Sequence, residues 1–328
     1  MAFRELDRPL RGIIPPMVTP LAAPDRLDEA ALQRLVEHLI TGGVHGLFLL
    51  GTCGEGPALS YQLRRRLVDR VCAQVDERVP VLVSITDTSY AESLALAHCA
   101  ADAGADALVL APPYYFPLEQ SELLAYVLRL AGEVPLPLML YNMPALTKSS
   151  FELATVRRLM DEPVVVGLKD SSGNLDYFQT IRQLSSVRPD WTLLIGPEHL
   201  LLRSLELGGD GGVSGGANVW PQLFVQMYEA ATAYSETVLA EQKDVVNYLA
   251  DQADRLGQIY LVGRAGRISA SSVVRGLKCA LSLLGICDDV VAEHMTRCSP
   301  NERQQVDGIL RSLGLRQAPT GDVTALPR

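Results

Sequence analysis

The chain has 328 residues, of which 48% are hydrophobic and 20% are charged, and its formal net charge is −9. This composition excludes a disordered or collagen-like chain. The acidic balance argues against a nucleic-acid-binding protein, which usually carries a basic surface. A small anionic substrate stays compatible with it, because a local pocket can be positive on an acidic protein.

The first twelve residues, MAFRELDRPLRG, are charged and contain no apolar segment, and no run of 18 apolar residues follows. We therefore expect neither a signal peptide nor a membrane span, and we expect the protein in the cytoplasm. The six cysteines form no CxxC pair and have no zinc-like spacing, so we expect reduced thiols. The five histidines show no metal-ligand spacing, and we expect no metal site.

Eight short apolar runs recur along the first two thirds of the chain, each bounded by Gly, Pro or polar residues. They are Gly12–Val18, Gly46–Leu50, Pro80–Ile85, Ala107–Ala111, Pro137–Tyr141, Val164–Leu168, Thr192–Ile195 and Gly211–Ser214. Continuous apolarity is typical of strands that are covered on both faces, as in a parallel sheet.

Helical patterns separate these runs. Apolar residues at i, i+3, i+4 and i+7 begin at Leu32, and Asp28 and Ser60 stand where helix N-caps are expected. Strands that alternate with helices predict an α/β fold, here a (β/α)₈ TIM barrel. A doubly wound sheet is the rival fold, but the first predicted strand is followed by no glycine fingerprint.

After Gly216 the pattern contains only helical stretches, near residues 221–233, 237–257, 270–285 and 301–313. We therefore divide the chain into three parts. They are a barrel that carries the active site (1–218), a C-terminal helical domain (219–316) and a tail expected to be disordered (317–328).

Lys169 directly follows the apolar run 164–168, at the strand end where TIM barrels place their active sites. Burial there favours the neutral amine. A neutral amine is a nucleophile toward ketones and forms a Schiff base. The alternative is a lysine that reaches solvent or pairs with Asp170.

Other polar residues stand at neighbouring strand ends. Tyr141 could relay protons, or could be a structural tyrosine with a satisfied hydroxyl group. Thr52 and Cys53 lie in a Gly-rich turn, whose backbone N–H groups could hold a small carboxylate. Glu55 is expected only to fix this turn. We do not expect Cys53 to be a nucleophile, because no histidine is near it in the sequence.

Together these motifs resemble the dihydrodipicolinate synthase / N-acetylneuraminate lyase family, the class I pyruvate-dependent aldolases. The resemblance runs from Gly12 to about Ile286. It rests on GIIPPMVTPL, GVHGLFLLGTCGEGPALS, DAGADALVLAPPYYF, YNMPA, VVGLKDSSGN, GGDGGVSGGANVWP and GLKCALSLLGI, in this order. It implies a barrel with a C-terminal helical domain, a homotetramer of two tight dimers, and no cofactor beyond the covalent imine.

The resemblance also implies roles for individual residues. Lys169 would be the Schiff-base lysine and Tyr141 the proton relay. Thr52, with the amides of Thr52 and Cys53, would hold the carboxylate of pyruvate. Tyr115 would reach into the neighbouring subunit's site and link the threonine to the tyrosine relay. The positions that would line the pyruvate pocket are Gly196 and Val213.

Two departures from the family pattern stand out. Cys53 replaces the second hydroxyl residue of the usual turn, and a thiol is a weaker hydrogen-bonding group. Leu146 stands where true dihydrodipicolinate synthases carry the arginine that binds the carboxylate of aspartate semialdehyde. Losing such a contact lowers the affinity for that carboxylate on the order of a hundredfold. Lys148 does not reproduce the two parallel hydrogen bonds that an arginine side chain donates.

The leading hypothesis is a Schiff-base-forming lyase or aldolase that acts on pyruvate or another 2-oxo acid together with an aldehyde. The PPYYF and KDSSG stretches resemble those of family members that act on 2-keto-3-deoxy sugar acids, and a dehydratase would use the same imine. One alternative is 4-hydroxy-tetrahydrodipicolinate synthase proper. The others are a phosphate-binding barrel such as a sugar-phosphate isomerase and a non-catalytic relative that binds a keto acid. We expect no nucleic-acid or membrane partner.

Overall fold

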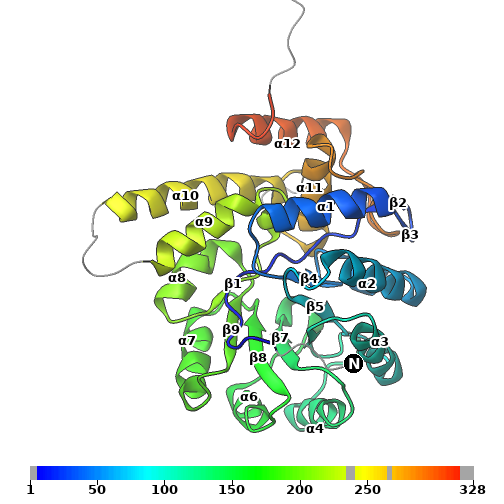
Figure 1. Ribbon diagram of the computed structural model, residues 1–328, viewed down its shortest axis with the longest axis vertical. Helices are drawn as coiled ribbons and strands as arrows, with labels where there is room; N and C mark the ends of the chain where they lie inside the picture. The colour runs from blue at the N-terminus through cyan, green and yellow to red at the C-terminus, as the bar shows by residue number, and fades with distance from the viewer. Residues whose placement is uncertain (1–5, 234–240, 264–267, 318–328) are drawn as a thin grey trace, which may run out of the picture.

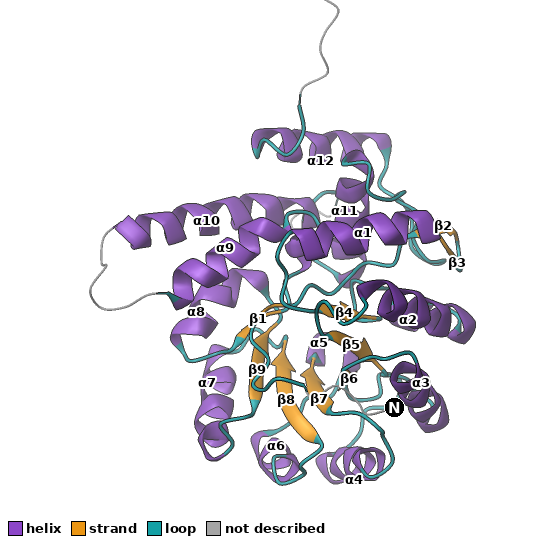
Figure 2. Cartoon of the chain, in the orientation of Figure 1, coloured by secondary structure: helices purple, strands orange, loops and turns teal. Residues whose placement is uncertain are grey.

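A parallel sheet of eight strands organises the computed structural model, which describes residues 6–233, 241–263 and 268–317. Its strand order is β1-β10-β9-β8-β7-β6-β5-β4. The strands are β1 (Gly12–Ile13), β4 (Leu47–Leu49), β5 (Val81–Ser84), β6 (Ala107–Leu110), β7 (Leu138–Asn142), β8 (Val165–Asp170), β9 (Thr192–Ile195) and β10 (Gly211–Gly212). Each coincides with one of the eight apolar runs, and the sheet curls inside a ring of helices (Figures 1 and 2).

The two ends of the sheet meet just beyond β1. Phe48 of β4 donates its backbone N–H to Pro15 (3.0 Å) and accepts a hydrogen bond from Met17 (2.9 Å). The predicted TIM barrel is therefore confirmed. The first strand was predicted over residues 12–18, and that length is wrong. Pro15 and Pro16 have no N–H group to donate, so regular pairing ends at Ile13.

Helices surround the barrel (Figure 1). They are α1 (Glu29–Thr41), α2 (Tyr61–Val75), α3 (Tyr90–Asp102), α4 (Gln120–Ala131), α5 (Pro144–Thr147), α6 (Leu153–Leu159), α7 (Leu175–Leu184) and α8 (Leu201–Glu206). Both predicted N-caps are confirmed, because the side chains of Asp28 and Ser60 accept hydrogen bonds from backbone N–H groups of the first turn. The hairpin of β2 (Leu21–Ala23) and β3 (Arg26–Leu27) was not predicted, since such short strands show no alternation.

Four further helices lie together at one end of the barrel, with α12 farthest from it (Figure 1). They are α9 (Pro221–Thr232), α10 (Glu241–Gly257), α11 (Ala270–Leu283) and α12 (Pro300–Ser312). The four predicted helical stretches match them. Residues 237–240 of the second stretch and 318–328 of the predicted disordered tail lie outside the described residues.

Apolar side chains fill the interior of the barrel. This cluster is separate from the larger one between sheet and helices, and it includes Phe48, Met139, Tyr141, Leu194 and Val213. The barrel interior is thus a packed core, and its layer nearest the active-site face is formed by residues at the C-terminal ends of the strands. No helix in the described parts of the chain is long and apolar enough to cross a membrane.

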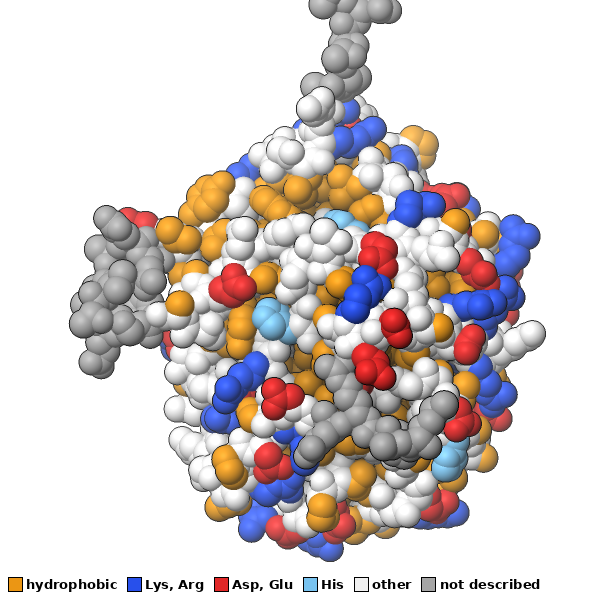
Figure 3. Space-filling view, viewed as in Figure 1, with side chains coloured by type: hydrophobic (Ala, Val, Ile, Leu, Met, Phe, Trp, Pro, Cys, Tyr) orange, Lys and Arg blue, Asp and Glu red, His pale blue; other side chains and the backbone are white. Residues whose placement is uncertain are grey.

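The surface seen in Figure 3 mixes acidic and basic side chains over the helices of the barrel. Apolar side chains gather higher on the same face, beneath α12. The two signs of charge are interspersed, and this face shows no large basic area.

Candidate active site

Strands β7 and β8 bring Tyr141 and Lys169 side by side, because the two residues are partners in the parallel register. The Lys169 Nζ atom lies 3.9 Å from the centre of the Tyr141 ring and 4.7 Å from that of Phe48. Lys169 is only 4% exposed. The amine is therefore held inside the barrel mouth against two aromatic faces, and the alternative of a lysine that reaches solvent is wrong.

Asp170 points away from this amine, as alternation along a strand requires. Its carboxylate accepts hydrogen bonds from Asn142 Nδ2 (2.8 Å) and from the Ser172 hydroxyl group (2.9 Å). Burial raises the pKa of Asp170 above its ordinary value, although these hydrogen bonds oppose the shift. The alternative in which Asp170 pairs with Lys169 is therefore also wrong.

The turn after β4, residues 51–56, lies beside the two strand ends and is called the β4 turn below. The Thr52 Oγ1 atom is 3.4 Å from the Tyr141 hydroxyl group. A Cβ atom on Gly56 would lie 2.1 Å from the Leu50 carbonyl oxygen, so the turn tolerates only glycine there. Thr52, Tyr141 and Lys169 thus converge from three different strands.

Cys53 is buried in the same turn. Burial raises the pKa of its thiol to about 12, while Lys169 nearby acts in the opposite direction. A thiol of this kind stays protonated at neutral pH, which agrees with the expectation that Cys53 is no nucleophile.

Gly196 and Val213 follow β9 and β10 at the same end of the barrel. A Cβ atom on Gly196 would lie 1.9 Å from the Ser171 hydroxyl oxygen, so no larger residue fits without displacing Ser171. Val213 is buried in the interior cluster with Phe48 and Tyr141. Both positions therefore lie beside the strand ends that carry the candidate catalytic side chains.

Within a single chain, Leu146 and Tyr115 are not part of the group formed by Thr52, Tyr141 and Lys169. Leu146 is on α5, directly after β7, and is 41% exposed. Tyr115 is 68% exposed, and its ring packs edge-on against Phe116 at 4.9 Å between centroids. The contact of Tyr115 with a neighbouring subunit's site stays a prediction.

The sequence reasoning missed a buried contact between Glu198 and Tyr260. Glu198 Oε2 accepts hydrogen bonds from the Gly216 N–H group (2.8 Å) and from the Tyr260 hydroxyl group (3.3 Å). Burial raises the pKa of Glu198 to about 7. The glutamate is visible after the seventh predicted strand, but its partner is 62 residues away and no local pattern links them.

Within residues 6–233, 241–263 and 268–317, no group of three or more His, Cys, Asp or Glu side chains is placed to hold a metal ion.

The chain matches the sequence model of the Dihydrodipicolinate synthetase family over residues 9–313. The chain belongs to this family. It is 38% identical over 226 residues to the 4-hydroxy-tetrahydrodipicolinate synthase of Salinibacter ruber, which covers 68% of this chain and 74% of the relative. It is 36% identical over 238 residues to the putative 2-dehydro-3-deoxy-D-gluconate aldolase YagE of Escherichia coli, covering 70% of this chain and 79% of the relative.

Solved structures of the family have the same fold. The dihydrodipicolinate synthase of Bacteroides thetaiotaomicron superimposes with a TM-score of 0.86 at 47% identity, covering 94% of this chain and all of that one. YagE from E. coli in complex with pyruvate gives a TM-score of 0.85 at 30% identity, with 94% and 100% covered. The chain is thus a member of a family of lyases and synthases, and the family aldolase hypothesis fits its relatives.

Proposed function

We propose that this protein is a class I lyase that forms a lysine imine with pyruvate or another 2-oxo acid. The convergence of Lys169, Tyr141 and Thr52 at the barrel mouth carries the proposal. A buried amine on an aromatic face, 4% exposed, is desolvated and oriented for attack on a ketone. The solved complex of YagE with pyruvate supports pyruvate as a ligand.

The proposed reaction runs through an imine and an enamine. The Lys169 nitrogen attacks the keto carbon, water leaves, and an imine forms. Loss of a proton from the adjacent carbon gives an enamine, which forms a C–C bond with the carbonyl carbon of an aldehyde. Hydrolysis of the imine then restores the lysine, and the reverse sequence cleaves the same bond.

Tyr141 and the β4 turn would assist these steps. The Tyr141 hydroxyl group carries protons to and from the carbinolamine oxygen, and Thr52 orients it from 3.4 Å away. The backbone N–H groups of Thr52 and Cys53 bind the carboxylate of the 2-oxo acid. No metal or other cofactor takes part in this proposal.

For the second substrate we propose the aldehyde half of a 2-keto-3-deoxy sugar acid. At the edge of the site, Leu146 places an exposed apolar side chain where an arginine would be needed to bind a second carboxylate. The relatives include both the aldolases YagE and YjhH and several synthases. The synthase of B. thetaiotaomicron, at 47% identity, keeps 4-hydroxy-tetrahydrodipicolinate synthase as the second candidate.

Trapping of the imine tests the proposed function. The protein is incubated with pyruvate, reduced with borohydride and mapped by peptide mass spectrometry. We expect an adduct on Lys169 and none on Lys148, Lys243 or Lys278, the only other lysines. Absence of an adduct with both pyruvate and 2-keto-3-deoxygluconate would overturn the proposal. An imine without turnover of any aldehyde would identify a keto-acid-binding relative.

We further propose that the active form is a homotetramer of two tight dimers, in which Tyr115 completes a neighbouring site. Tyr115 and Phe116 are exposed together, which favours burial of this pair between subunits. Sedimentation equilibrium should give four times the chain mass. A Tyr115→Ala variant should lose activity or assembly, and a fully active monomer would contradict the proposal.

A further inference from the structure

A buried ion pair joins the β4 turn to helix α11. Lys278 Nζ pairs with Glu55 Oε1, and both side chains are completely buried. Glu55 belongs to the same turn as Thr52 and Cys53, whereas Lys278 comes from the C-terminal helices. Removing either charge alone would leave the other one buried without its partner, which is strongly unfavourable.

The same two side chains hold a second segment, the C-terminal strap (residues 287–298). Glu55 Oε2 accepts a hydrogen bond from the Ala292 N–H group (2.7 Å). Lys278 Nζ donates a hydrogen bond to the Val290 carbonyl oxygen (2.6 Å). The ion pair thus lies between the β4 turn on one side and the strap on the other.

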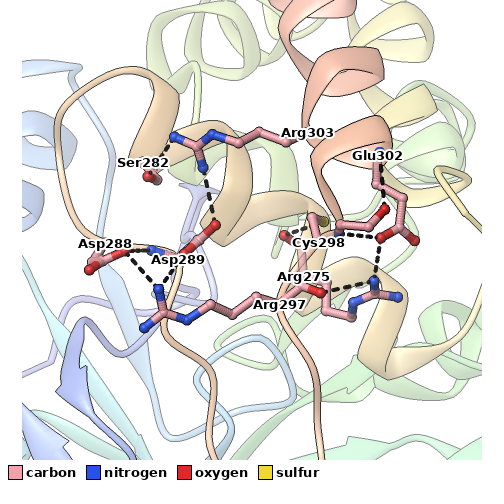
Figure 4. A network of polar contacts seen from close by, with 9 residues as sticks. Arg275, Ser282, Asp288, Asp289, Arg297, Cys298, Glu302 and Arg303 are labelled. Carbon is pink, nitrogen blue, oxygen red and sulfur yellow. Dashed lines mark hydrogen bonds and ion pairs between the residues drawn. The ribbon is translucent and has the colours of Figure 1, made fainter.

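The outer side of the strap is held by a network of arginine side chains (Figure 4). Asp289 accepts hydrogen bonds from Arg297 (3.1 Å) and from Arg303 of α12 (3.1 Å). Arg303 also donates to the Ser282 hydroxyl group of α11. The strap is therefore fixed to α11 and α12 before it reaches the ion pair.

The backbone of Glu55 carries this constraint to the site. Its N–H group donates to the Thr52 carbonyl oxygen (3.2 Å), which closes the turn. Its φ angle is +57°, in the left-handed region of backbone conformation that residues other than glycine rarely adopt. Such a conformation persists only where the surroundings enforce it, and here the buried side chain provides that anchor.

We propose that Glu55 and Lys278 are positioning residues that hold the β4 turn in the conformation that binds the substrate carboxylate. Neither side chain touches the substrate. Lys169 and Tyr141 stand on β8 and β7, outside the β4 turn. The turn reaches them through Thr52, 3.4 Å from the Tyr141 hydroxyl group, so a displaced turn slows trapping of any ketone in addition to weakening carboxylate binding. The inference rests on the proposed function, in which Thr52 and the neighbouring backbone amides bind the substrate carboxylate.

The test compares pyruvate with its methyl ester, which offers the same ketone without the negative charge. The rate of borohydride trapping on Lys169 is measured against ligand concentration for the wild type, Lys278→Met and Glu55→Gln. We expect the half-saturating pyruvate concentration to rise at least about tenfold in both variants. The value for the ester should change less than about twofold, since the ester makes no charged contact with the turn.

Arg275→Met is the matched control. Arg275 lies one helical turn before Lys278 on α11, pairs with Glu302 of α12 (2.8 Å) and donates a hydrogen bond to the Arg297 carbonyl oxygen at the end of the strap (3.3 Å) (Figure 4). Its loss therefore weakens the support of the strap and leaves the Glu55–Lys278 ion pair in place. This variant should melt at a lower temperature and keep the wild-type preference for pyruvate.

Two results would overturn the inference. One is that folded Lys278→Met and Glu55→Gln variants keep the wild-type preference, and the other is that they lose pyruvate and ester binding equally. If the single variants do not fold, Glu55→Gln/Lys278→Met, which leaves no unpaired charge, is measured in the same way. A wild-type protein without any adduct on Lys169 would instead overturn the proposed function, and the inference with it.

Discussion

The surroundings of Lys169 decide what its amine can do. Asp170, the next residue along β8, faces Asn142 and Ser172 and not this amine. The groups against the amine are the rings of Tyr141 and Phe48. The Cys53 thiol is also close to the amine. The Tyr141 hydroxyl group, 3.4 Å from Thr52 Oγ1, stands on the neighbouring strand as the proposed group for proton transfer.

Tyr141→Phe tests the proposed proton relay. The phenylalanine ring keeps the contact with Lys169 but has no hydroxyl group, so turnover should fall about 10²- to 10⁴-fold. Borohydride trapping of pyruvate should still modify Lys169, but more slowly, because the relay also serves the carbinolamine that precedes the imine. Tyr90→Phe on α3, whose hydroxyl group bonds Glu133 at the surface, is the control. Unchanged turnover in Tyr141→Phe would rule out the relay.

Leu146→Arg tests the choice of the second substrate. A guanidinium group on α5 could form the carboxylate contact that the wild type lacks, and such a bond contributes about 1.5–3 kcal/mol. The kcat/KM for condensation with aspartate semialdehyde should therefore rise roughly 10- to 100-fold. Leu146→Lys, which offers a charge without the fork, should gain less. No gain in either variant would contradict the specificity argument.

At the scale of elements, local sequence signals predicted most of the fold. The apolar runs located all eight strands of the barrel, and Asp28 and Ser60 located the starts of α1 and α2. These signals act over a few residues, which is why they can be read without knowing the partner element. The length of β1 was overestimated because the prolines after Ile13 are apolar but cannot donate to a strand.

Closure of the barrel depends on the close approach of β1 and β10. A Cβ atom on Gly211 would lie 2.0 Å from the Gly12 carbonyl oxygen, a backbone atom that cannot move without separating the strands. Gly211→Ala should lower the free energy of unfolding by about 3 kcal/mol or more, measured by denaturant titration.

Gly308→Ala is the matched substitution in an open place. Apart from its chain neighbours and the backbone of its own helix, no atom lies within 4 Å of the added Cβ, and Gly308 is inside helix α12. Alanine is the better helix former, so this variant should gain up to about 1 kcal/mol. A Gly211→Ala variant as stable as Gly308→Ala would show that β1 and β10 do not pack as described.

The whole molecule joins its barrel to its C-terminal helices through buried acidic groups. Glu55 contacts Lys278 of α11, and Glu198 contacts Tyr260 after α10. Both glutamates follow strands of the barrel, so the loops that shape the site are also the loops that the helices hold. This arrangement makes the C-terminal helices a support for the site, and their apolar side chains pack in the same cluster as those between the sheet and the barrel helices.

The junction at Glu198 should make stability depend on pH. Its folded pKa of about 7 lies above the ordinary value of 4.5. Between these pH values the unfolded chain has lost a proton that the folded chain retains. The protonated Glu198 therefore contributes its full stabilisation below pH 4.5. As the pH rises from 4.5 to 7 this contribution is lost, and the free energy of unfolding falls by about 3 kcal/mol in total.

Glu198→Gln removes this dependence, because glutamine is neutral at every pH. The melting temperature of the variant relative to the wild type should rise by several degrees between pH 4.5 and pH 8. Glu293 is exposed, and Glu293→Gln serves as the control. Its melting temperature relative to the wild type should not change over the same pH range. Parallel pH profiles for Glu198→Gln and the wild type would contradict the buried, protonated state.

The sequence by itself determined the parts of this protein that depend on short-range signals. Apolar runs and caps specified the strands and helix starts, and one lysine at a strand end indicated where an imine could form. Only the tertiary structure decided which distant groups meet. Glu55 and Ala292 are 237 residues apart, and Glu198 and Tyr260 are 62 apart. Periodicity and capping extend over a few residues, whereas these contacts exist only after the barrel closes and the C-terminal helices pack onto its loops.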